Sequence, residues 1–416
     1  MNRNIIRTAF DIGSYQIKGL VFRIREDDSI EILSLKSVIS KGIENGNLVD
    51  KDQFIQIMIE LVELLEKDSK VSIQNDVFIT LSGSNIKSVN SSTRKKAKDN
   101  EELLVDKKLK QELLSQCSDI QVSSDRYVLH NLDQGFFIDG STLIRNPISM
   151  VGKTIEAKSH LIHVPNFNMK QISFCFENEL QIKNVMPVFD GLAGAVSGLS
   201  EDQKKLGSIF LDIGSDKTNF VAFKDNYVVF SKVIPVGGNL VTKDIAAYLG
   251  CSLKEAEEIK KTKISSFANL ADENETFEVG LIDDELTKKV NTKEISKIAE
   301  LRYEDIIDHL KNIFRINSKE ISEFKSGIKL SGGGSNIKNI DLLFKSHFPG
   351  LKVELMSNKK IHFKEDLSEK RELVNLFGLS KWLIHSVDED GLYDYSDSKS
   401  NSIFKKIWNS ILNFFE

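Results

Sequence analysis

One short pattern occurs twice in this chain, at Asp11 and again at Asp212, and it constrains the fold more than any other feature. In each copy an apolar run leads into Asp-Ile-Gly-Ser, and a second apolar run follows a few residues later. Two apolar runs on either side of a turn with Asp, Gly and Ser are typical of a β-hairpin. The repetition indicates an internal duplication, so we expect two related halves.

The glycine in each turn suggests a chemistry for the two copies. Without a Cβ, glycine lets backbone N–H groups approach phosphate oxygens, so two such turns facing each other would hold a polyphosphate between the halves. An aspartate at the start of each turn suits Mg2+, which keeps much of its hydration shell and is held through water. A third element, Gly332–Gly334, follows the strand-like run Ile328–Ser331 and would let a base or ribose lie close to the backbone. One Asp-Ile-Gly turn alone is usually a plain hairpin, whereas three glycine elements in this order are much more specific.

Other classes of function lack their signatures in this sequence. The phosphate-binding loop GxxxxGK[ST], the zinc-protease motif HExxH and the hydrolase motif GxSxG do not occur. The net charge of -5 argues against broad binding to nucleic acid. Cys117, Cys175 and Cys251 lie far apart, which favours reduced cytoplasmic thiols over disulfides or a zinc site. No signal peptide opens the chain and no apolar run reaches about 18 residues, so we expect neither secretion nor a membrane-spanning helix.

Local patterns add to this outline. Helical spacing of apolar residues predicts a helix over Phe54–Leu65, and Val77–Gly83 predicts a buried strand that ends in glycine. The composition changes over residues 84–163, where the basic run Arg94–Lys98 meets acidic neighbours and predicts a solvated loop. Residues 253–311 predict helices with polar insertions.

Three further segments carry a family resemblance. They are Ser40–Ile43 with Gly46, Asn146–Gly152, and Val233–Gly238 with Val241–Ala246. Together with the three glycine elements, their order resembles the actin, Hsp70 and sugar kinase superfamily, and more narrowly the FtsA family of bacterial cell-division proteins. The resemblance runs from about residue 7 to 385 and resumes at the C-terminus.

The resemblance implies an α/β, actin-like fold in which two α/β halves enclose a nucleotide cleft. An FtsA-type subdomain replaces the usual second subdomain of the first half, and an amphipathic helix ends the chain. The implied division is subdomain 1A at 1–83, 164–195 and 363–385; subdomain 1C at 84–163; subdomain 2A at 196–230 and 306–362; subdomain 2B at 231–305; a flexible linker at 386–402; and a membrane-targeting helix at 403–416.

The resemblance also implies ATP and Mg2+ as the bound groups. The first phosphate element would be Asp11, Gly13, Ser14 and Lys18; the second would be Asp212, Gly214, Ser215 and Thr218; Glu257 and Lys260 would sit by the ribose and base; and Gly332, Gly333 and Gly334 would complete the adenosine side. Asp11 and Asp212 would hold Mg2+ through water. Two alternatives stay open, namely Lys18 as a surface lysine at a strand edge, and Glu257 with Lys260 as a surface ion pair at helical spacing.

The second turn departs from the family pattern Asp-x-Gly-Gly-Gly-Thr-x-Asp. It reads Asp212-Ile213-Gly214-Ser215-Asp216-Lys217-Thr218-Asn219, which replaces two glycines and the final aspartate. Asp216 facing a γ-phosphate would add like-charge repulsion, which Lys217 or a metal would offset. Aspartate tolerates the left-handed conformation, so the turn itself can survive. We therefore expect ATP binding with weak or absent turnover, and no residue stands out as the base that activates water.

The C-terminal residues predict an amphipathic helix behind a flexible tether. Residues 386–402 are acidic and serine-rich, and they cannot bury enough apolar area to offset ordering. At about 100° per residue, the apolar side chains beyond them cover one half of a helix: Ile403, Phe404, Ile407, Trp408, Ile411, Leu412, Phe414 and Phe415. Such a helix suits the membrane interface, and docking on the protein's own core is the alternative. The family resemblance implies a peripheral protein on the cytoplasmic side of the cytoplasmic membrane, at the division septum.

The resemblance implies partners as well. FtsA proteins self-assemble, anchor the C-terminal peptide of the tubulin-like protein FtsZ and meet later divisome proteins through subdomain 1C. In the helix Glu300–Asp305, Glu300, Arg302 and Asp305 would bind that peptide, with an exposed ion pair at i, i+3 as the alternative. No nucleic-acid partner is expected. Two other functions remain open: a small-molecule kinase of the same superfamily, and a pilus-assembly actin-like adaptor, which normally lacks its own amphipathic helix.

Overall fold

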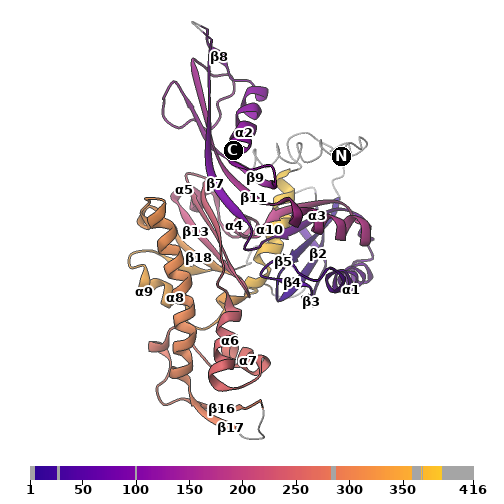
Figure 1. The fold of residues 1–416 in the computed structure, drawn as a ribbon, viewed down its shortest axis with the longest axis vertical. Helices are drawn as coiled ribbons and strands as arrows, with labels where there is room; N and C mark the ends of the chain where they lie inside the picture. The colour runs from indigo at the N-terminus through magenta and orange to yellow at the C-terminus, as the bar shows by residue number, and fades with distance from the viewer. Residues whose placement is uncertain are drawn as a thin grey trace.

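The computed structural model describes residues 5–25, 29–98, 101–282, 287–357, 367 and 369–386. Over these residues the chain is elongated, and two five-stranded sheets lie side by side in its middle (Figure 1). One further subdomain extends above these sheets in the view, and another extends below them. The predicted tether and amphipathic helix, apart from Ser386, lie outside the described residues.

The first sheet has the strand order β12-β6-β1-β2-β3. Its first three strands form an antiparallel meander: β1 (Ile5–Ile12), β2 (Gln16–Ile24) and β3 (Ile30–Ile39). Two strands then add in parallel, β6 (Asn75–Leu81) and β12 (Lys183–Phe189). Helix α1 (Lys51–Ser69) packs on this sheet, and Asp50 caps it by accepting from the backbone N–H of Gln53. The predicted hairpin, helix and buried strand are confirmed.

The second sheet repeats this topology, with the order β15-β14-β13-β18-β19. Here the meander is β13 (Ser208–Ile213), β14 (Thr218–Lys224) and β15 (Tyr227–Ile234), and the parallel strands are β18 (Gly327–Ser331) and β19 (Val353–Leu355). In both sheets the strand that ends in the Asp-Ile-Gly turn lies in the centre. The duplication inferred from the two turns is therefore confirmed at the level of the sheets.

Two helices lie between the sheets and join their cores. They are α4 (Asp190–Gly198), which follows β12, and α10 (Val374–Ser386), near the end of the described chain. The two helices approach closely, because a Cβ placed on Gly378 of α10 would overlap the carbonyl of Ala193 in α4. One buried apolar cluster contains residues from both sheets and both helices, so each half packs through these helices onto the other.

A three-stranded sheet is inserted after β6. It has the order β7-β11-β9, from β7 (Lys87–Lys96), β9 (Arg126–Ile138) and β11 (Thr154–Pro165), and α2 (Lys107–Gln121) covers it. The short strands β8 (Leu103–Leu104) and β10 (Val151–Gly152) pair beside it, with β8 near the far tip (Figure 1).

The basic run at the end of β7 corrects one expectation. Residues 94–96 are strand rather than loop, and only Ala97 and Lys98 of the run lie beyond the strand. Arg94 pairs with Glu156 on the neighbouring strand at 2.6 Å, and Lys95 pairs with Glu112 of α2 at 3.0 Å. Two basic side chains of the run are thus in cross-strand and strand–helix ion pairs with carboxylates that are distant in sequence.

The second half carries its own insertion after β15. It contains α6 (Gly238–Leu249), α7 (Leu253–Thr262), the hairpin of β16 (Thr276–Gly280) and β17 (Thr287–Asn291), and the long helix α8 (Thr292–Ile316). The polar insertions predicted within 253–311 therefore include a β-hairpin. Smaller helices complete the described chain: α3 (Asn166–Phe174), α5 (Glu201–Leu206) and α9 (Ile340–His347). Within the described ranges, none of the helices has both the length and the apolar character needed to cross a bilayer.

Candidate functional site

The three glycine elements meet around the ends of the two central strands. The second turn is closed by the N–H of Gly214, which donates to the carbonyl of Lys217 at 2.8 Å. The N–H of Gly238, at the start of α6, donates to the carbonyl of Gly214 at 3.0 Å. A Cβ on Gly334 would lie 2.9 Å from the carbonyl oxygen of Ile213, and a Cβ on Gly332 would overlap the Asp212 carboxylate. Only glycine permits this close approach.

A short hairpin of the first half bridges the two turns. It consists of β4 (Ile43–Glu44) and β5 (Asn47–Leu48). The N–H of Gly46 donates to Ser14 Oγ of the first turn at 3.1 Å, and the N–H of Asn45 donates to Asp216 Oδ2 of the second turn at 3.1 Å. The predicted phosphate elements are thus close to each other across the boundary between the halves.

The first aspartate is held by an ion pair. Asp11 accepts from Lys18 Nζ at 2.7 Å and from Thr80 Oγ1 at 3.0 Å. Lys18 faces Asp11 directly across the hairpin and its side chain is largely buried. Burial acts to lower the pKa of Lys18, but the charge of Asp11 and the hydrogen bond to it raise the pKa overall. Lys18 is therefore not a surface lysine at a strand edge.

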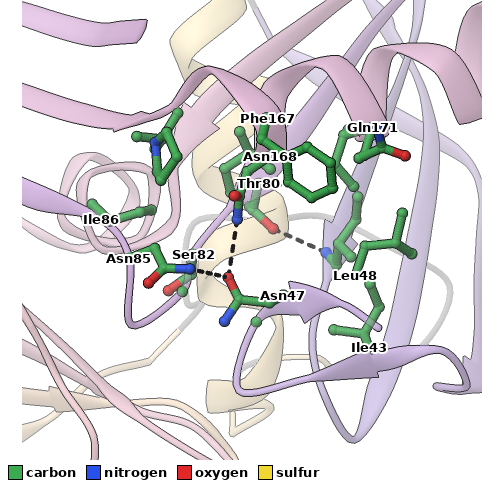
Figure 2. Close-up of a pocket in the computed structure, with 17 residues that line it drawn as sticks. Ile43, Asn47, Leu48, Thr80, Ser82, Asn85, Ile86, Phe167, Asn168 and Gln171 are labelled. Carbon is green, nitrogen blue, oxygen red and sulfur yellow. Dashed lines mark hydrogen bonds between the residues drawn. The ribbon is translucent and has the colours of Figure 1, made fainter. Parts of the chain in front are cut away.

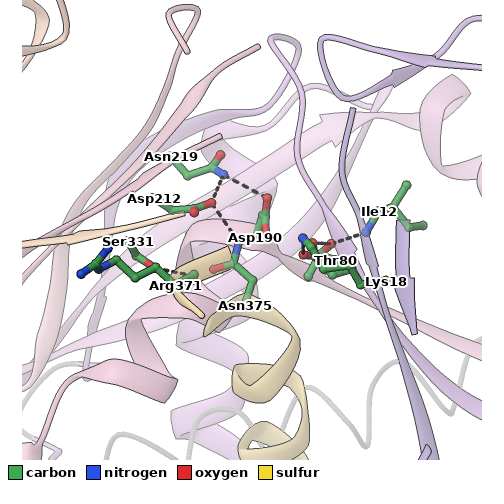
Figure 3. A network of polar contacts seen from close by, with 10 residues as sticks. Ile12, Lys18, Thr80, Asp190, Asp212, Asn219, Ser331, Arg371 and Asn375 are labelled. Atoms are coloured by element: carbon green, nitrogen blue, oxygen red, sulfur yellow. Dashed lines mark hydrogen bonds and ion pairs between the residues drawn. The ribbon is translucent and has the colours of Figure 1, made fainter. Parts of the chain in front are cut away.

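The second aspartate belongs to a buried network of carboxylates and amides (Figure 3). Asp212 Oδ2 accepts from Asn219 Nδ2 at 3.0 Å and from Asn375 Nδ2 at 2.8 Å. The same two amides donate to Asp190, at 3.0 Å and 2.6 Å. Ser82 of the first half donates to Asn219 Oδ1 at 2.6 Å, which ties β6 to β14.

This network explains why the final position of the second turn is an asparagine. Asn219 offers one N–H to each carboxylate, whereas an aspartate would place a third carboxylate beside Asp190 and Asp212. Burial, followed by the charges of Asp11 and Asp212, raises the pKa of Asp190 well above its usual range. Burial also raises the pKa of Asp212. The two amides are the donors that allow these carboxyls to be buried together.

Glu257 and Lys260 lie on α7 against the start of α6. Lys260 Nζ lies 2.6 Å from Glu257, 2.8 Å from Thr242 Oγ1 and 3.0 Å from the carbonyl of Gly238. Burial lowers the pKa of Lys260 despite the neighbouring carboxylate. The ion pair is present but largely buried, and Gly238 connects it to Gly214 and Gly334.

The three predicted partner-binding residues do not share one environment. Arg302 contacts Asp305 at 3.1 Å and also Asp244 of α6, on a partly exposed face of α8. Glu300 differs from the expectation, because its carboxylate is buried and accepts from the N–H of Ala268 and from Lys297. Glu300 therefore holds the segment around Ala268 rather than facing solvent beside Arg302.

The sequence pattern does not include several residues of the buried polar network. Asp190 directly follows the buried parallel strand β12. Ligand-binding residues commonly lie at the carboxyl ends of parallel strands, so this position in the sequence could have predicted Asp190 as a site residue. Asn375, Thr80 and Ser82 gave no comparable signal. The sequence predicts for Lys217 only that it offsets the charge of Asp216. In the structure its amine is buried and has no hydrogen-bond partner among the described residues.

A pocket of about 240 Å³ opens between the β4–β5 hairpin and α3. Figure 2 shows its mixed lining, which combines the apolar side chains of Ile43, Leu48 and Phe167 with a cluster of amides. Within that cluster, Asn47 Oδ1 accepts from Asn168 at 3.0 Å and from Asn85 at 3.4 Å. Two residues of its lining connect the pocket to the site, since Gly46 donates to Ser14 of the first turn and Ser82 donates to Asn219 of the buried network.

Comparison with known families matches two parts of the chain. The family described as "Cell division protein FtsA" matches residues 209–372, and the one described as "SHS2 domain inserted in FTSA" matches residues 83–163. Three relatives named cell division protein FtsA are similar along most of their length. That of Pseudomonas aeruginosa is 27% identical over 79% of this chain and 77% of its own. That of Bacillus subtilis is 27% identical over 80% and 74%, and that of Escherichia coli is 25% identical over 79% and 79%.

Solved structures of other actin-like proteins share the fold. The complex titled PilM-PilN type IV pilus biogenesis complex contains a chain with a TM-score of 0.62 and 14% identity, over 91% of this chain and 98% of that one. MreB5 of Spiroplasma citri bound to ADP gives a TM-score of 0.56 and 14% identity, over 92% and 98%. At this identity these likenesses concern the fold alone, and the predicted α/β actin-like fold with its inserted subdomain is confirmed.

Proposed function

Since the chain belongs to the FtsA family of actin-like cell-division proteins, we propose that it binds ATP between its two halves, assembles with itself and tethers FtsZ filaments to the inner face of the cytoplasmic membrane at the division septum. Residues 84–163 would serve to recruit later divisome proteins. The observation that carries the nucleotide part is the meeting of three glycine elements at the ends of the two central strands.

The residues present fit a nucleotide. Gly334 lies against the second turn, where a Cβ would be 3.2 Å from the carbonyl oxygen of Gly214, and Gly238 donates its N–H to that same carbonyl. The turns of Gly13–Ser14 and Gly214–Ser215 would bind the phosphates, with the adenosine side at Gly332–Gly334 and Lys260. Asp11 and Asp212 would hold Mg2+ through water, and the ion would neutralise phosphate charge.

We expect turnover to be slow or absent. Asp190 is the one carboxyl of the network that the sequence pattern did not include, and both of its oxygens accept hydrogen bonds from buried amides. A carboxyl in that state is held in place rather than free to take a proton from water. This favours a structural use of ATP, in which the nucleotide joins the two halves, over the alternative of a small-molecule kinase.

The membrane part of the proposal rests on the sequence of residues 403–415, which lie outside the described structure. A single interfacial helix binds lipid weakly and reversibly, so stable attachment requires several helices on one polymer. The FtsZ peptide would meet the face of α8 that carries Arg302 and Asp305, whose side chains keep 38% and 47% of their exposure. The resemblance to the pilus-assembly protein concerns the fold alone.

Liposome co-sedimentation tests this function directly. The full chain and a chain ending at Lys399 are each spun with vesicles of anionic and zwitterionic lipid, with and without ATP. We expect only the full chain to pellet, and more of it with ATP, because assembly supplies avidity. If both chains stay soluble under all conditions, the membrane part of the proposal fails. An added FtsZ C-terminal peptide, labelled for fluorescence polarisation, tests the tether, with Arg302→Glu as the weakened variant.

A further inference from the structure

Lys217 has an unusual position for a lysine. It lies in the second glycine turn, is 7% exposed, and its Nζ has no hydrogen-bond partner among the described residues. An ammonium group taken out of water is costly unless it is paired. A residue in this state points to a hydrogen-bond acceptor that the described part of the polypeptide does not supply.

The amine reaches across the boundary between the halves. A Cβ placed on Gly46 would overlap Lys217 Nζ, and Gly46 has the positive φ of 71° that favours glycine. Gly46 is also the residue whose N–H binds Ser14 of the first turn. Lys217 Nζ therefore lies where the two glycine turns and the β4–β5 hairpin come together.

The surrounding charges are acidic but are not its hydrogen-bond partners. Burial lowers the pKa of Lys217, and the charges of Asp190, Asp212 and Asp216 oppose that shift. Asp216 accepts hydrogen bonds from Asn45 and Asn239. Asp190 and Asp212 accept hydrogen bonds from the two buried amides. The acidic groups thus oppose the lowering of the amine's pKa without satisfying its N–H donors.

The departures of this turn from the family pattern act together. Lys217 adds one positive charge, Asn219 removes one negative charge and Asp216 adds one negative charge, so the turn gains one positive charge in sum relative to Asp-x-Gly-Gly-Gly-Thr-x-Asp. Relative to the family pattern, that balance makes this turn less repulsive to an anion.

We propose that Lys217 Nζ binds a phosphoryl group of the polyphosphate held between the two glycine turns. This inference rests on the proposed nucleotide binding and adds to it a ligand that the family pattern does not contain. The bound anion would give the amine the partner that it lacks, so the free protein carries a local instability that the ligand removes.

The test uses the full chain, with ATP and inorganic tripolyphosphate as separate probes. Calorimetric titration gives affinities, and thermal unfolding gives the stability of each ligand-free variant. Lys217→Met and Lys217→Gln remove the charge, and Lys232→Met serves as the control because Lys232 is an exposed lysine on β15 of the same half. We expect both Lys217 variants to lose at least tenfold in affinity for both probes, while the free variants melt no lower than the wild type. The control should change neither quantity.

The possible outcomes separate this inference from the function it rests on. If the Lys217 variants bind ATP within twofold of the wild type, the inference is overturned and nucleotide binding stands. If the wild type binds tripolyphosphate through Lys217 but not ATP, the inference stands and the nucleotide proposal fails. If the free Lys217 variants melt several degrees lower than the wild type, the lysine is a structural group and the inference is overturned. If neither probe binds the wild type, the inference and the nucleotide proposal both fail.

Discussion

Asn219→Asp would restore the aspartate of the family pattern, and the structure predicts that it destabilises this protein. Asn219 is 1% exposed and donates one N–H to Asp190 and one to Asp212, each at 3.0 Å. Aspartate has no N–H to donate, so both hydrogen bonds are lost and a third carboxylate joins the other two. Ser82 can still donate to the new side chain, as it does to Asn219.

The magnitude follows from the two lost hydrogen bonds. A hydrogen bond to an ionised group contributes about 1.5–3 kcal/mol, and one between neutral groups about 0.5–1.5 kcal/mol. Because burial raises the pKa of Asp190 well above its usual range, we count Asp190 as the neutral acceptor and Asp212 as the charged one. The variant should therefore lose roughly 2–4.5 kcal/mol of unfolding free energy at pH 7.

The pH dependence has a definite sign. Burial beside two carboxyls raises the pKa of the introduced Asp above its unfolded value, so its ionisation opposes folding. The loss is then largest at pH 7 and becomes smaller as the pH falls towards 5, where the new carboxyl takes up a proton. Urea denaturation followed by circular dichroism at both pH values measures this, with the exposed Asn274→Asp as the matched control. A loss below about 0.5 kcal/mol at pH 7, or a loss as large at pH 5, would refute the reasoning.

Three further predictions concern other parts of the chain. Trp408→Glu should abolish pelleting with lipid while leaving ATP affinity unchanged, whereas Asn409→Glu, which adds the same charge on the polar face, should still pellet; equal loss in both would contradict an interfacial helix. Burial lowers the pKa of His160 to about 3, so this neutral side chain supports folding above pH 6.5. Below that value its contribution to the unfolding free energy falls by about 1.4 kcal/mol per pH unit. Unfolding free energy measured from pH 6.5 to 4.5 should therefore fall less steeply for His160→Asn than for the wild type, and parallel curves would contradict this. Gly378→Ala should cost more than about 2 kcal/mol, because the new methyl group overlaps the carbonyl of Ala193 where α10 meets α4; a shift in the urea midpoint no larger than that of an exposed Gly→Ala control would show that the helices can separate without loss.

The sequence by itself determined the local elements and the family. The two Asp-Ile-Gly-Ser turns predicted two hairpins from the apolar runs on either side of them. The structure explains the glycine of the first turn, since a Cβ on Gly13 would lie 2.7 Å from the carbonyl oxygen of Gln16. The apolar spacing predicted helix α1. Asp50, directly before the helix, caps it by accepting from the N–H of Gln53, three residues along the chain. These features depend on neighbours in the chain, and the segment motifs around them were enough to indicate FtsA.

Only the tertiary structure decided which side chains meet in the buried polar network. Asn375 reaches Asp212 from 163 residues away, and Ser82 reaches Asn219 from 137 residues away. The same holds for Glu300, which shares the helix of Arg302 but faces the core. It also holds for Lys217, whose charge is evident in the sequence, whereas the lack of a hydrogen-bond partner for it within the described ranges is not. The physical reason is that burial and pairing depend on how distant segments pack, whereas turns and helix caps are set by atoms a few residues apart.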